Sequence, residues 1–197
     1  MRLRRVFSCL KRLRICRARK GLFQLKSLQS DDFELFDLDQ RFALDRAALD
    51  TRWKDLQREA HPDKFADQGA AAQRVAMQWS VRINEAYQRL KDPLKRAAYL
   101  CELHGAPVNA ENNTAMPAAF LMQQMQWRED LDEATAPEDL TQIHAQVNHA
   151  MREVHRKIEQ LIDTQQAYTE AVGLVRSLMF MERFADDVDK RLDQIEN

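Results

Sequence analysis

The tripeptide His61-Pro62-Asp63 places an imidazole two positions from a carboxylate, a pair that could perform acid–base chemistry. A catalytic relay would also need a nucleophile held beside the imidazole. No Ser or Cys stands in a recognisable nucleophile motif, and the 4 glycines are isolated, so there is no glycine-rich loop to bind phosphates. The sequence therefore predicts that this protein is not an enzyme and that the tripeptide serves another purpose.

Metal binding is the other chemistry that the histidines and cysteines could support. Cys9 and Cys16 lie close together in the sequence, but no second pair of ligands follows them, as a structural zinc site would need. Cys101 lies in an apolar segment and is predicted to be a buried structural thiol. The remaining histidines show no i, i+4 pair and are predicted to be solvated: His104, His144, His149 and His155. We therefore expect neither a metal nor a cofactor.

The composition is that of a helical protein. Hydrophobic residues make up 45% of the 197 residues and charged residues 31%, while there are only 4 Gly and 5 Pro. The dominant residues, among them Ala, Leu, Gln, Glu, Lys and Arg, favour helices. Three cysteines are too few for a disulfide scaffold, and no apolar run approaches the roughly 18 residues of a membrane-spanning helix. The length suits one large or two small domains.

Basic residues are concentrated at the N-terminus. Residues 1–30 contain 10 of the 30 Lys and Arg and no acid, so the other 167 residues carry a net charge of −11. This segment is predicted to be a disordered extension, and three interpretations of it stay open. It could be a mitochondrial presequence, an arm that binds nucleic acid or an anionic membrane, or no functional element at all, such as an extension from a misplaced start codon. The acidic body argues against nucleic-acid binding.

Two amphipathic helices are predicted to position the tripeptide. Asp45 can cap the first helix, and Pro62 must end it, so residues 61–65 are predicted to form a turn. A second helix is predicted over residues 69–91, and two helices joined by so short a loop pack as an antiparallel hairpin. The apolar stripe of the first helix consists of Leu49, Trp53, Leu56 and Ala60. Its basic residues, mostly off that stripe, are Arg46, Arg52, Lys54 and Arg58.

The segments on both sides of the tripeptide resemble a known family. Residues 56–64 (LQREAHPDK) are similar to the end of helix II and the loop of a J-domain, and residues 83–99 (INEAYQRLKDPLKRAAY) to helix III and the segment after it. The resemblance implies that the protein docks on a DnaK-class chaperone and promotes ATP hydrolysis by that chaperone. The residues implied to bind the chaperone are His61, Pro62, Asp63, Lys64, Arg52, Lys54 and Arg58.

The C-terminal half is predicted to be a three-helix bundle. Residues 105–116 are rich in turn formers and are predicted to be a linker after a first domain at residues 31–104. Helices are predicted over residues 117–134 and about 166–195, with a long amphipathic helix between them. Short connections between three such helices favour one bundle with a shared apolar core, which forms a second domain at residues 117–197.

A J-domain followed directly by a helical bundle resembles HscB-type co-chaperones of iron–sulfur cluster assembly. The most specific similarity lies in residues 119–133 (AFLMQQMQWREDLDE), and further matches occur at residues 33–36 and 99–105. The resemblance implies an L-shaped, all-α protein that brings the scaffold protein IscU, on which the cluster is built, to an HscA-like chaperone. The residues implied to bind this scaffold are Leu121, Met122, Met125, Gln126, Glu129, Glu133 and Phe180.

Alternatives stay open for the patch and for the function. Helical periodicity alone favours Leu121, Met125 and Phe180 as bundle core, whereas the resemblance favours an exposed patch in which Met adapts to the shape of the partner. A J-protein that delivers other clients is the alternative function. We expect a monomer that binds neither nucleic acid nor membrane, in the bacterial cytoplasm, with the mitochondrial matrix as the alternative location.

Overall fold

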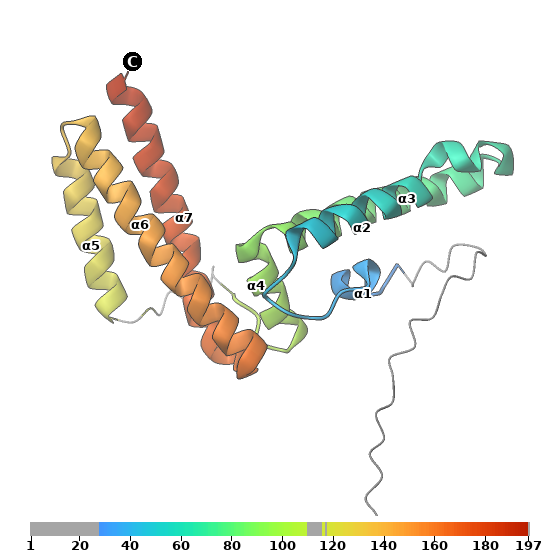
Figure 1. The fold of residues 1–197 in the computed structure, drawn as a ribbon, viewed down its shortest axis with the longest axis horizontal. Helices are drawn as coiled ribbons and strands as arrows, with labels where there is room; N and C mark the ends of the chain where they lie inside the picture. The colour runs from blue at the N-terminus through green and yellow to red at the C-terminus, as the bar shows by residue number, and fades with distance from the viewer. Residues whose placement is uncertain (1–27, 110–115, 117, 197) are drawn as a thin grey trace, which may run out of the picture.

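Two helical arms meet at a corner in the computed structural model of this protein, which describes residues 28–109, 116 and 118–196 (Figure 1). Every regular element in these residues is a helix, so the predicted all-α, L-shaped architecture is confirmed. Residues 1–27 and 110–115 lie outside the described residues, and the interpretations of the basic segment and of most of the linker stay predictions. In chain order the elements are α1 (Asp32–Phe36), α2 (Arg46–Glu59), the 3₁₀ helix η1 (Pro62–Gln68), α3 (Ala70–Lys91), α4 (Pro93–Leu103), α5 (Ala118–Glu133), α6 (Pro137–Glu159), the π-helix η2 (Gln160–Thr164) and α7 (Tyr168–Glu196).

The first arm is the hairpin of α2 and α3, with α1 against its base. The Asp45 carboxylate accepts hydrogen bonds from backbone N–H groups in the first turn of α2, so the predicted cap is confirmed. The segment predicted as a turn is instead a 3₁₀ helix of 7 residues. Pro62 can begin this helix because its ring fixes φ at a value that suits a first helical position, and the 3₁₀ conformation continues through Gln68. Gly69, at a φ of +88°, then directs the chain into α3.

The core of this arm is built from the apolar faces of all three helices. Burying a Leu, Ile or Phe side chain completely stabilises the fold by about 1.5–3 kcal/mol. The largest fully buried side chains here are Phe33, Phe36, Leu49, Ile83 and Leu90. The apolar stripe predicted for the first helix therefore faces inward, and its basic face is left toward solvent.

A buried ionic cluster fastens α1 to α3. The Asp32 side chain is completely buried, and its two oxygens lie 2.6 Å from Nη2 of Arg82 and 2.8 Å from Nη1 of Arg89. The backbone N–H of Asp32 donates to the Tyr99 hydroxyl of α4, 3.0 Å away. Burying a carboxylate costs free energy unless cations and hydrogen-bond donors surround it. The contacts of Asp32 therefore fix the position of α1 on this arm.

The second arm is the bundle of α5, α6 and α7. Helices α6 and α7 pack against each other along their length, and the buried residues of α6 follow the spacing that predicted the helix. Helix α5 buries a single side chain, Trp127, whose indole stacks on Phe184 of α7 with ring centroids 5.9 Å apart. Phe120 and Leu131 are partly buried against the same core, and most other side chains of α5 are exposed. None of the described helices is long and apolar enough to cross a lipid bilayer.

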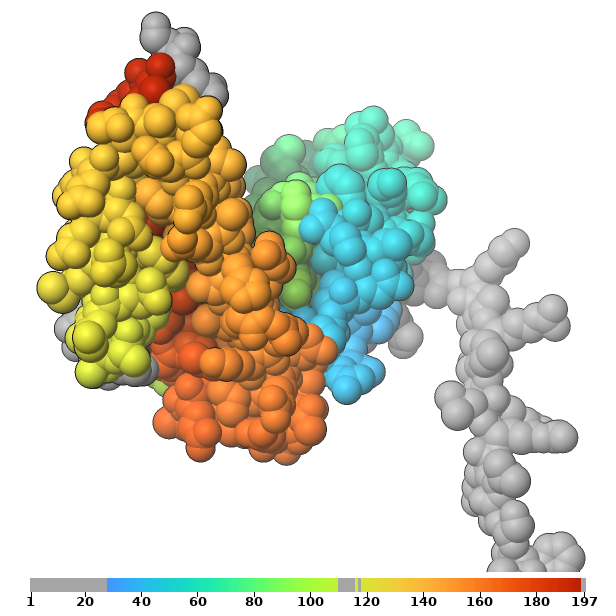
Figure 2. Space-filling view, turned by 60° about the vertical axis from the view of Figure 1, so that its left-hand side comes forward, coloured from blue at the N-terminus to red at the C-terminus, as the bar shows by residue number. Residues whose placement is uncertain are grey.

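Helix α4 forms the corner, because it packs against α3 in the first arm and against α7 in the second. Figure 2 shows the lower end of α6 (orange) in contact with the segment that precedes α2 (blue). At this end α6 gives way to η2 before the chain turns into α7. The guanidinium of Arg176 in α7 donates two hydrogen bonds to the Val108 carbonyl oxygen, at 2.8 and 2.6 Å. The described start of the predicted linker is therefore held against the bundle.

Candidate functional site

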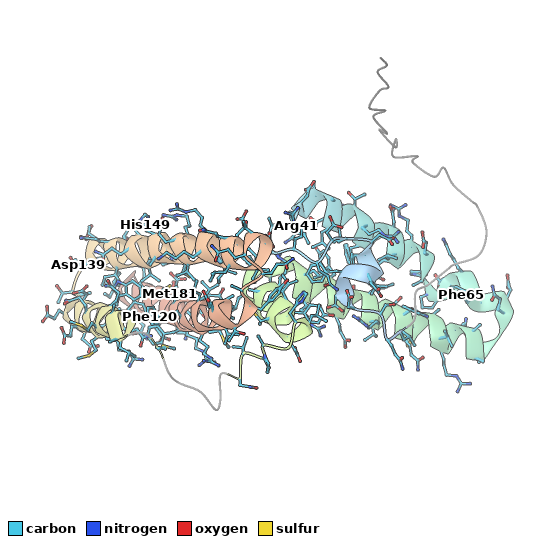
Figure 3. All side chains as sticks on the ribbon, turned by 90° about the horizontal axis from the view of Figure 1, so that it is seen from below. Arg41, Phe65, Phe120, Asp139, His149 and Met181 are labelled. Atoms are coloured by element: carbon cyan, nitrogen blue, oxygen red, sulfur yellow. The ribbon has the colours of Figure 1, made fainter. Side chains whose placement is uncertain are left out.

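The tripeptide His61-Pro62-Asp63 lies at the far end of the first arm. Figure 3 labels the neighbouring Phe65 at this end, well away from the bundle. His61 is the N-cap of η1: its Nδ1 accepts a hydrogen bond from the Asp63 backbone N–H at 3.3 Å, and its carbonyl oxygen accepts one from the Lys64 N–H at 3.0 Å. The imidazole thus shapes its own loop, as a capping side chain does.

Exposure makes the loop suitable for contact with another protein. The side chains of His61 and Asp63 are 57% and 88% exposed, and Lys64 is exposed beside them. An Asp63 carboxylate oxygen lies 3.5 Å from Nδ1 of His61, so the two side chains lie close together within the loop. Catalytic electrostatics depend on a water-excluded setting, which neither group has. The arrangement offers a small polar surface with a fixed shape.

The basic face of α2 is only partly free. Arg52 forms an ion pair with Asp37, the residue after α1, and Arg58 forms one with Asp55 at 3.1 Å, whereas Lys54 stands exposed. Pairs on a protein surface contribute about 0–1 kcal/mol, so the carboxylate of a partner can replace Asp55 at little cost. Arg58 and Lys54 are therefore the accessible cations of this face. Arg52 is instead held by its ion pair with Asp37 at the base of the arm.

A polar belt that the sequence analysis missed keeps α2 in register with α3. The Trp53 indole stacks on the Tyr87 ring with centroids 4.7 Å apart, and its Nε1 donates to Asn84 Oδ1 at 2.9 Å. The Tyr87 hydroxyl donates to Asp50 at 2.9 Å and accepts from Arg46 at 3.1 Å. Burial, followed by the bond to Asp50, raises the pKa of Tyr87, so the hydroxyl keeps the proton that it donates. The guanidinium of Arg46 is therefore held by Asp50 and Tyr87 within the arm.

The solvent side of α5 carries an exposed Leu–Met patch, formed by Leu121, Met122 and Met125. Their side chains are 44%, 72% and 62% exposed, respectively. The interpretation of Leu121 and Met125 as bundle core is therefore wrong, because α5 contacts the bundle through its other side, where Trp127 is buried. Large apolar side chains gathered on one exposed helix face are typical of a surface that binds a partner.

Polar residues border this patch along the same side of α5. Glu129 and Glu133 are exposed. They follow Met122 by 7 and 11 positions, so the three side chains lie on the same side of the helix. Gln126 is also exposed, but its side-chain amide donates to Asp130 at 2.8 Å. The two glutamates can therefore meet donors on a partner, while Gln126 is oriented by its own helix.

Phe180 of α7 is half-buried between α5 and α7. Its ring lies edge-on to Phe120 at 5.9 Å and stacks on Phe184 at 6.2 Å, and the Arg128 guanidinium covers it at 5.5 Å. It forms part of a groove of about 360 Å³ between α5 and α7. Phe180 therefore packs in the bundle, as periodicity predicts, and also lines a surface groove, while its contact with a scaffold stays a prediction.

The histidines and Cys101 do not form a metal site. No group of three or more potential ligands converges anywhere in the described ranges. Cys101 is buried, as predicted, and burial raises the pKa of its thiol to about 11. His149 is exposed, but the prediction that His155 is solvated is wrong: its Nε2 is buried, and burial, with the nearby charge of Arg96, lowers its pKa.

Comparison with known proteins shows the family to which this chain belongs. A family model described as the HSCB C-terminal oligomerisation domain matches residues 116–189. The co-chaperone protein HscB homolog of Paraburkholderia xenovorans is 46% identical over 178 residues, which cover 88% of this chain and 100% of that protein. This chain belongs to the HscB family of co-chaperones.

Solved structures of HscB proteins share the two-armed fold. HscB from Vibrio cholerae superimposes with a TM-score of 0.72 at 32% identity, covering 84% of this chain and 99% of that one. Human HscB superimposes with a TM-score of 0.76 at 26% identity, covering 88% of this chain and 85% of that one. The resemblance to HscB-type J-domain co-chaperones of iron–sulfur cluster assembly is thereby confirmed.

Proposed function

We propose that this HscB-family protein stimulates ATP hydrolysis by an HscA-type chaperone of the DnaK class and targets an IscU-type scaffold protein to it. Through this coupling it aids the maturation of iron–sulfur proteins. The observation that carries the proposal is the presence of two exposed surfaces on different arms, the tripeptide loop and the Leu–Met patch. A protein that joins two partners needs two such surfaces, whereas an enzyme needs one enclosed site.

The first arm is the part that meets the chaperone. Lys54, Arg58 and Lys64 are exposed on α2 and the loop, and they suit a negatively charged partner surface. Charges of this kind increase the rate of encounter and set its orientation more than they add affinity. The preshaped loop of His61, Pro62 and Asp63 then supplies the specific contact, at little ordering cost because its backbone is already fixed.

The second arm is the part that meets the scaffold. Leu121, Met122 and Met125 provide apolar area at the centre of the contact, and Glu129 and Glu133 stand at its rim. Methionine side chains adapt to the shape of a partner, and the rim carboxylates select for donors on it. Phe180 packs against Phe120 of α5 and adds an aromatic ring to the groove between α5 and α7.

The remaining features of the proposal concern chemistry, location and oligomeric state. The protein itself performs no chemistry, because the ATP is hydrolysed by its partner, and it binds neither nucleic acid nor membrane. The curated relative named above is bacterial, which supports a bacterial cytoplasmic location. The monomeric state stays a prediction that light scattering can test, since the matching family model is described as an oligomerisation domain.

Steady-state ATP hydrolysis by a purified HscA-type chaperone tests the proposal. The chaperone is assayed with this protein, with an IscU-type scaffold, or with both. We expect that both together increase the rate far beyond the product of the two separate effects. Stimulation by this protein that is indifferent to the scaffold would favour the delivery of other clients instead. Absence of any stimulation would contradict the chaperone half of the proposal.

A further inference from the structure

Phe42, in the segment between α1 and α2, lies where the two arms meet. Its side chain is 5% exposed, and its ring has the Arg96 guanidinium of α4 at 5.1 Å and the His155 ring of α6 at 6.2 Å. The Phe42 carbonyl oxygen accepts a hydrogen bond from Arg96 Nε at 2.8 Å. One residue of the first arm is thus in contact with the corner helix and with the bundle.

Asp163 of η2 completes this contact from the bundle side. Its Oδ1 accepts a hydrogen bond from the Phe42 N–H at 2.6 Å, and its Oδ2 accepts one from the Ala43 N–H at 2.8 Å. Both bonds join residues at least 120 positions apart in the chain. Hydrogen bonds to an ionised carboxylate are about twice as strong as neutral ones, and two in parallel also fix orientation.

The π-helix explains how Asp163 reaches this position. At Gln160 the helix widens from α6 into η2, and this shifts the following side chains around the axis relative to a continuous α-helix. Isolated π-turns are rare and occur frequently at functional positions. Here the π-turn lies at the end of α6 that contacts the first arm, and it contains the carboxylate that bonds to that arm.

A second set of contacts holds the other side of the corner. The His104 and Tyr168 rings stack with centroids 3.9 Å apart and planes within 5°, and the Cys101 thiol lies 3.6 Å from the Tyr168 carbonyl oxygen. The two arms are thus attached at two separate points, Phe42 and Tyr168. Rotation of one arm about either point would break the contacts at the other. The angle between the arms is therefore set by side-chain contacts as well as by the covalent link through α4.

We propose that Asp163 is a positioning residue: by holding Phe42 and Ala43 it fixes the angle between the arms, and this fixed angle lets a scaffold bound to α5 act on the chaperone engaged by the loop. The coupling part of this inference rests on the function proposed above. A flexible joint would raise only the effective concentration of the scaffold near the chaperone. A fixed joint also presents it in one orientation, which removes an ordering cost.

The positioning role is tested with neither partner present. Spin labels are placed on Gln68→Cys in η1 and Glu138→Cys in α6, both at exposed sites, in a Cys9→Ser, Cys16→Ser background, and their distance distribution is measured by pulsed electron resonance. We expect one narrow distribution in the parent protein and a broadened or shifted one in Asp163→Ala. The matched control is Asp189→Ala, which removes an exposed carboxylate from α7 and should leave the distribution narrow. An unchanged distribution in Asp163→Ala would overturn the positioning role.

The coupling role is tested in the three-component ATPase assay. For Asp163→Ala we expect the cooperative stimulation by protein and scaffold together to fall by about fivefold or more, the lower end of common coupling strengths. Stimulation without scaffold and the scaffold dissociation constant should both stay within about twofold, since neither surface is touched. Retained cooperativity despite a broadened distance distribution would overturn the coupling role.

Two further observations keep this test decisive. If Asp163→Ala loses its helical circular dichroism, Asp163→Asn replaces it: the amide keeps the size of the side chain but offers one acceptor oxygen to two N–H donors. If the parent protein itself shows no cooperative stimulation, the proposed function fails and the coupling role fails with it. The distance measurement then still decides whether Asp163 positions the arms.

Discussion

Nδ1 of His61 accepts a hydrogen bond from the backbone N–H of Asp63, 3.3 Å away. A nitrogen that accepts carries no proton, so the proton of the neutral ring sits on Nε2. No hydrogen bond within the described residues uses that second nitrogen, and 57% of the side chain is exposed. Nδ1 of the imidazole therefore holds the loop in shape, while Nε2 remains available to a partner.

Replacing His61 with Gln is expected to reduce stimulation of the chaperone ATPase at least roughly tenfold, because the specific contact at the tip of the first arm loses its ring. Scaffold affinity should change by no more than about twofold, since the Leu–Met patch lies on the other arm. Titrating the variant into the ATPase assay, with calorimetry for scaffold binding, measures both. His149→Gln, at an exposed position in the bundle, is the matched control. Full stimulation by His61→Gln would show that the loop assignment is wrong.

The double substitution Leu121→Ala with Met122→Ala should weaken scaffold binding about tenfold or more, because it removes the centre of the patch. The free energy of unfolding should stay within about 0.5 kcal/mol of the parent value, since both side chains are largely exposed. Phe180→Ala provides the contrast: it removes ring contacts inside the bundle and should cost about 1–2 kcal/mol of stability as well as affinity. Calorimetric binding and urea denaturation separate the two effects. Unchanged affinity in the double variant would remove the patch from the proposal.

Local features of this fold could be predicted from the sequence because their causes lie within a few residues. Asp45 caps α2 and Pro62 ends it through interactions with their immediate neighbours, and the spacing of apolar residues in α6 follows from helical geometry alone. The two surfaces became predictable through their resemblance to a family. Periodicity could not show which side of α5 is buried, because apolar residues occur almost all round it, from Leu121 to Trp127.

The contacts that set the orientation of the elements were not predictable, because their partners lie far apart in the chain. Asp32 stands in an acidic run that is typical of a solvated surface, yet two arginines more than 45 positions away bury it. His155 lies at a charged stretch of α6, but its ring packs against Phe42 of the first arm and its Nε2 is buried. Asp32 acquires its environment only when α1 packs on α3, and His155 only when the two arms meet, so neither residue carries a local signal.

Neutralising the buried carboxylate of Asp32 tests how firmly α1 is held. Asp32→Asn keeps the size of the side chain but leaves Arg82 and Arg89 facing an amide in place of an anion. We expect a loss of about 2–3 kcal/mol in the free energy of unfolding, below the usual range for a broken buried pair because Arg89 is 42% exposed. Urea denaturation followed by circular dichroism measures it. Asp39→Asn, at an exposed carboxylate of the same segment, should change stability by less than about 0.5 kcal/mol.

His155 should make the stability of the fold depend on pH. Burial, and then the positive charge of Arg96, lowers its pKa from the ordinary value of 6.5, against a smaller opposing effect of Asp92. The folded protein therefore prefers the neutral ring, and the unfolded chain takes up the proton first as the pH falls. Stability from this group is complete above pH 6.5 and declines as the pH drops from 6.5 through the lowered pKa of the folded state.

His155→Leu removes this titration, and His149→Leu, at an exposed position of the same helix, should not. Thermal or urea unfolding between about pH 5.5 and 7.5 measures the slope for each protein, and subtracting the His155→Leu curve cancels the groups that all three share. We expect the parent protein and His149→Leu to lose stability toward acid more steeply than His155→Leu. Parallel curves for all three proteins would mean that the His155 ring titrates as it does in the unfolded chain, and that the contact with Phe42 opens freely in solution.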